Sequence, residues 1–192
     1  MSSIILASES FLKMFIFDKS KLPYETEPAY IDETVYDNLP VGERVAKLAE
    51  SKAAKIVETN PDATIISADT LTADANGNVY NKLSHGDDPF AAAMNLSGKT
   101  IDIYTGCCVY NKTTGYNTKT IKSSITYRTF SQQTLQRLIE SDNAAIRSGA
   151  LGIFYDSPGF TLIDRIEGSY TGSFGLPMEF VYEQLDKVEQ VI

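Results

Sequence analysis

Two acidic and three basic side chains at separate places in the chain could together handle a small phosphorylated compound. The carboxylates are those of Glu33 and Asp69, and the lysines are Lys13, Lys52 and Lys82. Carboxylates hold hard cations such as Mg²⁺ or Mn²⁺, and lysine ammonium groups neutralise phosphate oxygens. This chemistry needs the side chains to meet, so the elements that carry them decide whether a site exists.

Two serines stand where a strand is expected to end and a helix to begin. The apolar run at 3–7 predicts a buried strand, and residues 11–17 are apolar enough for a short helix. Ser8 and Ser10 lie between them. The first turn of a helix presents unpaired N–H groups and the positive end of the helix dipole. The junction therefore predicts an anion-binding site.

Lys52 falls on the apolar side of the clearest predicted helix, residues 41–59. Val45, Leu48 and Ile56 follow the spacing of one helical face, and Lys52 lies on the same stripe. An inward lysine is costly unless its ammonium group reaches solvent or meets an anion. Both outcomes are open from the pattern: the side chain extends to the surface, or it delivers a cation into a site.

Asp69 and Thr70 directly follow residues 63–68, which predict a buried strand. In α/β sheets ligands gather at the carboxyl ends of strands, so we expect Asp69 at such an end. The turn Asn76-Gly77 predicts a hairpin that folds the chain back and brings Lys82 close to Asp69. An exposed hairpin lysine is the alternative for Lys82.

Glu33 belongs to the segment Ile31-Asp32-Glu33-Thr34, which we expect in a loop after the extended residues 23–28. Adjacent carboxylates in a loop are often only solvated surface groups. The pattern by itself therefore leaves the role of Glu33 open.

The composition excludes several classes of protein. The 192 residues include 43% hydrophobic and 22% charged residues and carry a net charge of −8. This composition is that of a globular protein, and no stretch supplies the basic stripe that a nucleic-acid binder needs. No apolar run approaches a membrane span and the first residues do not resemble a secretory signal, so we expect a cytoplasmic protein.

Cysteine and histidine give little support to other catalytic or metal sites. Cys107 and Cys108 are adjacent, so in a strand they point to opposite faces and suit neither one metal nor a mutual disulfide. His85 is the sole histidine in the sequence, which argues against a Cys/His zinc site and against a Ser-His-Asp triad.

The remaining segments alternate between strand and helix patterns, with no linker that would separate independent domains. They are two long strands at 100–110 and 116–130, a helix at 131–140 capped by Ser131, two strands at 149–154 and 161–166, and a helix at 176–191. The chain therefore predicts a mixed α/β fold.

Short segments spread over almost the whole chain share their order and spacing with one protein family. They are Ile5-Leu6-Ala7-Ser8-Glu9-Ser10, Ile31-Asp32-Glu33-Thr34, Leu48-Ala49-Glu50-Ser51-Lys52-Ala53, Ser67-Ala68-Asp69-Thr70, Tyr104-Thr105-Gly106, Gly149 with Gly152-Ile153, Ile166-Glu167-Gly168-Ser169-Tyr170 and Gly175-Leu176-Pro177. In these segments the chain resembles the Maf family of nucleoside-triphosphate pyrophosphatases.

The resemblance implies a fold, a reaction and an assembly. The fold is a mixed twisted sheet with flanking helices, an elongated two-lobed single domain over residues 1–192 with a central cleft, as in inosine-triphosphatase-like proteins. The reaction is hydrolysis of a nucleoside triphosphate to the monophosphate and pyrophosphate, which clears non-standard nucleotides. The resemblance also implies a homodimer, for which exposed apolar residues of the hairpin at 100–130 would supply the contact.

The resemblance also implies a role for each candidate residue. Glu33 and Asp69 are expected to hold a Mg²⁺ or Mn²⁺ ion, with Asp69 also the general base. The other roles concern the triphosphate: Lys52 and Lys82 are catalytic cations, and Ser8, Ser10, Lys13 and Thr70 bind the substrate.

Two segments depart from the family pattern. The usual Pro-Arg-Arg is Phe11-Leu12-Lys13 here, and the usual Gly-Lys-Pro is Asn81-Lys82-Leu83. A lysine still holds phosphate, but without the bidentate geometry of arginine. One alternative is therefore a catalytically weakened nucleotide-binding protein linked to cell-division control.

The residue after Asp69 separates two substrate branches of the family that the chain resembles. Asp-Thr is typical of the branch that acts on dTTP, UTP and related pyrimidine nucleotides, and Asp-Gln is typical of the 7-methyl-GTP branch. Thr70 favours the pyrimidine branch, with 7-methyl-GTP as the alternative substrate.

Overall fold

The computed structural model describes residues 3–74, 77–80, 88–141 and 158–189. Its elements, in chain order, are β1 (Ile4–Leu6), α1 (Phe11–Asp18), β2 (Glu25–Thr26), the 3₁₀ helix η1 (Glu33–Tyr36), α2 (Val41–Val57), β3 (Thr64–Ala73), β4 (Val79–Tyr80), α3 (Pro89–Met94), β5 (Thr100–Asn111), β6 (Gly115–Tyr127), α4 (Gln132–Ser141), η4 (Pro158–Leu162), β7 (Ile163–Glu167), η5 (Gly172–Phe174) and α5 (Met178–Asp186). Lys82, His85 and the strand predicted at 149–154 lie outside the described residues.

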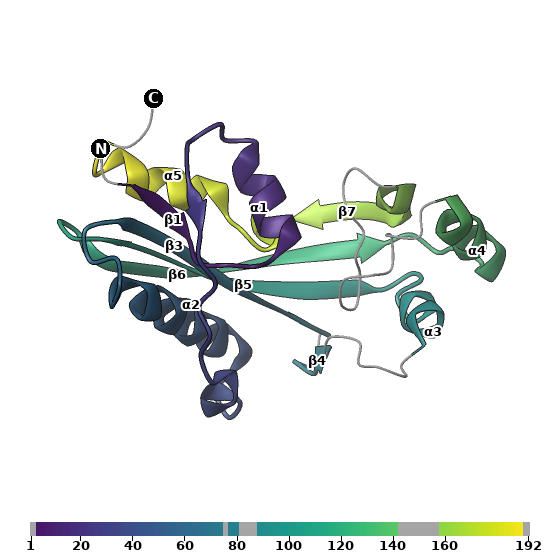
Figure 1. Ribbon diagram of the computed structural model, residues 1–192. Helices are drawn as coiled ribbons and strands as arrows, with labels where there is room; N and C mark the ends of the chain where they lie inside the picture. The colour runs from purple at the N-terminus through teal and green to yellow at the C-terminus, as the bar shows by residue number, and fades with distance from the viewer. Residues whose placement is uncertain (1–2, 75–76, 81–87, 142–157, 190–192) are drawn as a thin grey trace. The chain divides into compact units, whose positions relative to one another are not determined.

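The strands of the described residues form one seven-stranded mixed sheet (Figure 1). Its order is β2-β1-β3-β5-β6-β7, and the short β4 pairs with β3. β1 runs parallel to both β2 and β3, whereas the β3–β4 and β6–β7 pairs are antiparallel. Helices flank the sheet, so the predicted mixed α/β class is confirmed.

The chain divides into two compact units. The first comprises Met1–Thr70, Tyr104–Ser123 and Gly168–Ile192, and the second comprises Leu71–Ile103 and Ser124–Glu167. Strands β3, β5 and β6 each continue from one unit into the other. Every predicted site residue that the structure describes belongs to the first unit. That the whole chain forms a single domain stays a prediction.

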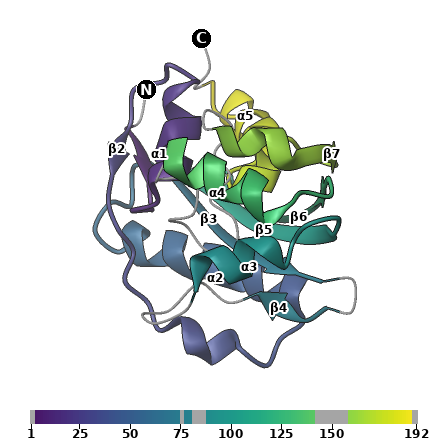
Figure 2. The same cartoon turned by 90° about the vertical axis from the view of Figure 1, so that its right-hand side faces the viewer.

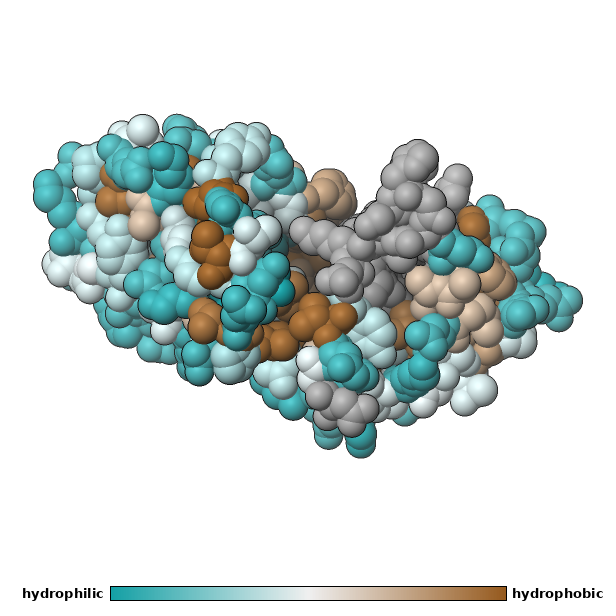
Figure 3. All heavy atoms as spheres, turned by 90° about the horizontal axis from the view of Figure 1, so that it is seen from below, coloured by the Kyte–Doolittle hydropathy of each residue, from teal (hydrophilic) through white to brown (hydrophobic). Residues whose placement is uncertain are grey.

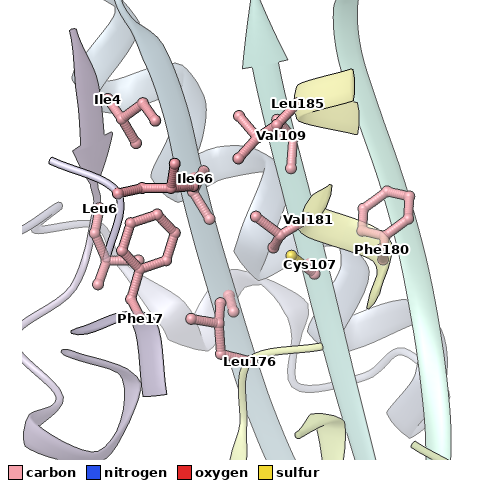
Figure 4. Close-up of a cluster of buried hydrophobic side chains, with 12 residues drawn as sticks. Ile4, Leu6, Phe17, Ile66, Cys107, Val109, Leu176, Phe180, Val181 and Leu185 are labelled. Atoms are coloured by element: carbon pink, nitrogen blue, oxygen red, sulfur yellow. The ribbon is translucent and has the colours of Figure 1, made fainter. Parts of the chain in front are cut away.

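In the first unit, helices cover both faces of the sheet. α2 lies on one face, and α1 and α5 lie on the other (Figure 1). The core under α1 and α5 contains Phe17, Ile66 and Val181 (Figure 4). Neighbouring residues of a strand point to opposite faces, so Ile65 belongs instead to the core under α2, together with Ala49. The apolar run at 63–68 is therefore buried on both faces.

Cys107 and Cys108 show the same alternation on β5. Cys107 packs in the core under α1 and α5, and Cys108 packs in the core under α2. Both are buried free thiols. Burial raises the pKa of the Cys108 thiol to about 11, and burial also raises the pKa of Cys107. The prediction that the two side chains point to opposite faces is confirmed.

A glycine on β5 lets α2 lie directly against the sheet. A Cβ atom on Gly106 would clash with the Val45 carbonyl oxygen, so no side chain fits there. On the neighbouring strand β3, the hydroxyl of Ser67 donates to the carbonyl oxygen of Ala49 at 2.6 Å. α2 is thus held close to both strands, and Lys52 is carried with it.

The second unit has a core of its own. Its buried residues include Ile101 of β5, Tyr127 of β6 and Leu135 of α4. α3 and α4 pack against each other (Figure 2). The hydroxyl oxygen of Ser131 accepts a hydrogen bond from the N–H of Thr134 at 3.1 Å, which confirms the predicted cap of α4.

The face shown in Figure 3 is mostly hydrophilic, with separate hydrophobic patches. The exposed large apolar side chains among the described residues are those of Phe11, Tyr30, Val35, Tyr116, Phe160 and Tyr170. Of these, only Tyr116 lies on the β5–β6 hairpin, where the dimer contact is expected. Among the helices that the structure describes, none is long and apolar enough to cross a membrane.

Candidate active site

Lys52 of α2 lies between two carboxylates. Its ammonium nitrogen is 2.6 Å from Oδ1 of Asp69 on β3 and 2.7 Å from Oε1 of Glu33 on η1. The side chains of Lys52 and Asp69 are only 14% and 12% exposed, whereas that of Glu33 is 48% exposed. Of the two outcomes that the helical pattern leaves open, the second is therefore observed: the inward lysine meets anions.

The positive charge of Lys52 is stabilised by these neighbours. Burial acts to lower the pKa of the ammonium group, because it penalises the charged form. The carboxylates of Asp69 and Glu33 outweigh this effect, and the pKa of Lys52 is raised above its ordinary value. Lys52 therefore carries a positive charge at neutral pH and is suited to act as a cation rather than as a base.

Asp69 lies inside β3, so the prediction that it stands at the end of its strand is wrong. β3 continues to Ala73, because its last residues pair with Val79–Tyr80 of β4. The predicted hairpin is thus present, and its pairing extends the strand beyond Asp69. The side chain of Asp69 faces α2, as does that of Ser67 two residues earlier.

Glu33 begins the short helix η1, where the sequence predicts a loop. Asp32 caps this helix: its carboxylate accepts hydrogen bonds from the N–H of Thr34 at 3.0 Å and from the hydroxyl of Thr34 at 2.6 Å. η1 is also tied to α2, because the hydroxyl oxygens of Tyr36 and Ser51 are 2.8 Å apart. The two adjacent carboxylates thus have different tasks, and only Glu33 contributes to the site.

Ser8 and Ser10 shape the junction between β1 and α1. The hydroxyl oxygen of Ser10 accepts from the N–H of Lys13 at 3.4 Å, and that of Ser8 accepts from the N–H of Ser10 at 3.1 Å. Each hydroxyl proton can still be donated to an anion. The predicted strand–serine–helix junction is confirmed, and anion binding there stays a prediction.

Lys13 and Thr70 come together at a different place, next to Gly175 at the end of η5. A Cβ atom on Gly175 would lie 3.0 Å from Oγ1 of Thr70 and 3.8 Å from Nζ of Lys13. Thr70 follows Asp69 on β3 and therefore points to the opposite face of the strand. Five of the described site residues thus form two groups on opposite faces of β3: Glu33 and Asp69 lie around Lys52 on the α2 side, and Lys13 and Thr70 lie beside Gly175.

Comparison with known proteins decides the family. The family described as Maf-like protein matches residues 3–188 of this chain. The chain belongs to the Maf-like protein family. It is 34% identical to the dTTP/UTP pyrophosphatase of Moorella thermoacetica over 189 residues. These residues are 96% of this chain and 94% of that relative. The protein of the same name from Bacillus pumilus is 31% identical over 181 residues, which are 93% of this chain and 92% of that relative. The one from Aquifex aeolicus is 30% identical over 182 residues, which are 95% of this chain and 93% of that relative.

The two carboxylates of this Maf-like protein are of the ligand type that a hard cation prefers. One oxygen of Glu33 and one of Asp69 contact the same lysine nitrogen, so both point into one small space. Within the described part of the chain, no group of three or more His, Cys, Asp or Glu side chains gathers for a metal ion. A Mg²⁺ or Mn²⁺ ion beside the two carboxylates would therefore take its other ligands from phosphate oxygens and water, as Mg²⁺ commonly does.

Two residues of this Maf-like protein take a place in the site only through the tertiary structure. Thr105 on β5 donates to the carbonyl oxygen of Gly172 at 2.9 Å, and its hydroxyl oxygen is 3.1 Å from that of Thr70. Tyr36 ties η1 to α2. A single Thr or Tyr gives no chemical signal in a sequence, and the segment Thr105-Gly106 stands out only as part of the family pattern.

Proposed function

We propose that this chain hydrolyses nucleoside triphosphates to the monophosphate and pyrophosphate, with dTTP and UTP as preferred substrates. The observation that carries the proposal is the Lys52 ammonium group held between Asp69 and Glu33, in a chain of a family whose compared relatives are named dTTP/UTP pyrophosphatase. Thr70, directly after Asp69, supports the pyrimidine preference. Removal of non-standard nucleotides is the cellular role that such an activity would serve.

Cleavage between the α- and β-phosphates requires positive charge and an activated water molecule. The phosphate oxygens are negative and repel a nucleophile, so a fixed cation lowers the barrier. Lys52 supplies such a cation, and two ion pairs hold it in place. Asp69 acts as the general base: it accepts a proton from the water, whose oxygen bonds to phosphorus while the bridging P–O bond breaks.

Glu33 and Asp69 would hold a divalent metal ion together with the triphosphate. Such an ion, when bound, withdraws charge from the phosphate oxygens. The side chain of Glu33 is about half exposed and can turn towards an incoming ligand, whereas Asp69 is almost buried on β3. The two carboxylates thus combine one fixed and one adjustable oxygen donor.

The remaining site residues are assigned to binding the nucleotide. Ser8 and Ser10 lie at the N-terminal end of α1, where N–H groups and the helix dipole favour phosphate. Lys13 and Lys52 lie on opposite faces of β3. We therefore assign Lys13 to a different part of the nucleotide from Lys52. Lys82, outside the described residues, stays assigned to the phosphates.

The test is product analysis with natural and modified triphosphates in the presence of Mg²⁺ or Mn²⁺. The wild type is expected to release equal amounts of monophosphate and pyrophosphate from dTTP and UTP. Asp69→Asn is expected to lower turnover by about a hundredfold or more, because the general base is lost. Asp62→Asn is the control, since Asp62 is an exposed carboxylate paired with Lys112. Unchanged turnover in Asp69→Asn would remove the general-base role.

A nucleotide-binding protein without turnover is the second candidate. It is favoured by the segment Phe11-Leu12-Lys13, which keeps one cation where the family has two arginines. In this case triphosphates raise the melting temperature of the protein but are recovered intact. The substrate panel also includes 7-methyl-GTP, and a preference for it over dTTP would replace the pyrimidine assignment.

We also propose that the chain forms a homodimer, as the family resemblance implies. Tyr116 is 44% exposed on β6 and supports a contact through the β5–β6 hairpin.

A further inference from the structure

Thr70 belongs to a chain of hydrogen bonds whose direction can be deduced. Thr105 is fully buried, and its hydroxyl oxygen is 2.9 Å from the carbonyl oxygen of Gly172 and 3.1 Å from the hydroxyl oxygen of Thr70. A carbonyl oxygen only accepts, so the single hydroxyl proton of Thr105 is donated to Gly172. The hydrogen bond between the two threonines is then donated by Thr70.

Thr70 is left as an acceptor on its remaining side. Because its own proton points towards Thr105, a group that approaches from elsewhere meets only lone pairs. A phosphate oxygen, which is also an acceptor, would receive no hydrogen bond from Thr70 there. A ligand group that carries an N–H would be bound.

The surroundings keep this side of Thr70 approachable. Gly175 has a φ of +97°, and a Cβ atom on it would lie 3.0 Å from Oγ1 of Thr70, so the missing side chain leaves space beside the hydroxyl. The N–H of Gly175 donates to the same carbonyl oxygen of Gly172 at 3.0 Å, which holds the turn in place. Thr70 is partly exposed, whereas Thr105 is fully buried. Of the two hydrogen-bonded threonines, a ligand can therefore contact Thr70.

We propose that Thr105 is a positioning residue that fixes the Thr70 hydroxyl as an acceptor for the imide N–H of a uracil or thymine ring. Uracil and thymine carry a hydrogen on N3, whereas N3 of cytosine is itself an acceptor. Thr70 therefore favours uracil and thymine nucleotides over cytosine nucleotides, and Thr105 sets this preference without touching the ligand. The ammonium group of Lys13, beside the same glycine, suits a ring carbonyl next to the imide. The inference rests on the proposed function, because it assumes a nucleotide at this site.

The experiment measures the binding of α,β-methylene UTP and α,β-methylene CTP by calorimetry. A CH₂ group replaces the bridging oxygen in both compounds, so neither can be cleaved there. The wild type is expected to bind the uracil compound about tenfold more tightly, since the cytosine compound would place two acceptors face to face. Thr105→Val keeps the shape of the side chain but lets the Thr70 proton turn outwards, so the preference should approach unity. Thr105→Ser restores the hydroxyl and should restore the preference.

Each other outcome overturns the proposal. It is overturned if the wild type binds neither compound or binds both equally, or if Thr105→Val keeps the wild-type ratio. A loss of affinity for both compounds at a constant ratio also overturns it, because that pattern means a purely structural role. Thr70→Val removes the acceptor itself and should abolish the preference, which keeps the test decisive if Thr105→Val fails to fold.

Hydrolysis is followed separately, as pyrophosphate release from UTP. A wild type that shows the binding preference but releases no pyrophosphate would end the proposed function and leave the present inference standing. A wild type that cleaves UTP while binding the two compounds equally would overturn the present inference and leave the proposed function standing.

Discussion

At the scale of single residues, the surroundings of a side chain decide its task. Lys52 is an inward lysine by its helical position, and two ion pairs turn it into a fixed positive charge. Asp32 and Glu33 are adjacent and have the same chemistry, yet Asp32 caps η1 and Glu33 contacts Lys52. Residue type therefore limits the chemistry that a position can perform, and the contacts select one role.

Lys52→Met is expected to weaken both stability and activity. Removing the ammonium group leaves the almost buried carboxylate of Asp69 without its partner, which costs about 3 kcal/mol in the free energy of unfolding at pH 7. Turnover should fall by about a hundredfold, because a preorganised cation is lost. Lys55→Met is the matched control on the same helix: Lys55 is 51% exposed, and its ion pair with Glu58 should contribute little. Denaturant titration and pyrophosphate release measure the two effects.

The same variant has a pH signature. Burial opposes the charge on Lys52, but Asp69 and Glu33 outweigh it and raise the pKa of the folded state above its ordinary value of 10.5. A raised pKa means that this stabilisation is complete below the unfolded pKa and is lost as pH rises through the folded pKa. The stability difference between wild type and Lys52→Met should therefore be constant from neutral pH to about pH 10 and shrink above it. A difference that does not shrink would contradict the ion-pair account.

At the scale of elements, the site depends on how closely α2 lies on the sheet. α2 carries Lys52, and β3 beneath it carries Asp69. Gly106 on β5 allows the backbone of α2 at Val45 to come into direct contact with the strand. The close approach of the helix thus brings the lysine within reach of its carboxylates.

Gly106→Ala is expected to destabilise the protein by about 3 kcal/mol, because the added Cβ atom would press on the Val45 carbonyl oxygen. Gly42→Ala, in α2, is the matched control, and we expect it to stabilise the protein rather than destabilise it. Its Cβ atom would lie 3.6 Å from Thr120 and 3.7 Å from Tyr104, which is ordinary contact. Alanine favours a helix over glycine by up to about 1 kcal/mol. Urea unfolding of both variants tests the pair, and a Gly106→Ala protein as stable as wild type would disprove the tight packing.

At the scale of the whole molecule, the charge balance makes the local arrangement of lysines important. The chain carries a net charge of −8, and a nucleoside triphosphate is also strongly negative. Long-range electrostatics therefore oppose the approach of the substrate, and fixed cations such as Lys52 must act at short range.

Light scattering after size-exclusion chromatography is expected to give twice the mass of one chain, because we propose a homodimer. Tyr116→Glu places a charge on the proposed contact and should shift the protein towards the monomer. Phe160→Glu changes another exposed aromatic residue, in the second unit, and should leave the mass unchanged. A wild type with the mass of one chain would disprove the dimer. A Tyr116→Glu protein that is still dimeric would show that the dimer contact does not depend on Tyr116.

Local sequence patterns predict most of the helices and strands that the structure describes. The helical stripe of α2, the serine junction before α1 and the turn between β3 and β4 are properties of neighbouring residues, so they are readable without the fold. The end of β3 is not, because its last residues are extended by pairing with β4. η1 is missed as well, since the cap on Asp32 and the contact between Tyr36 and Ser51 depend on the packing of the segment against α2.

The sequence by itself determined the chemical groups of this protein, the family that it resembles and the inward position of Lys52. Only the tertiary structure decided how those groups are combined. Lys52 is joined to Asp69 and Glu33 on the α2 side of β3, and Lys13 and Thr70 meet on the other side. The physical reason is that side-chain alternation along a strand is local, whereas the partner on each face arrives from a distant part of the chain.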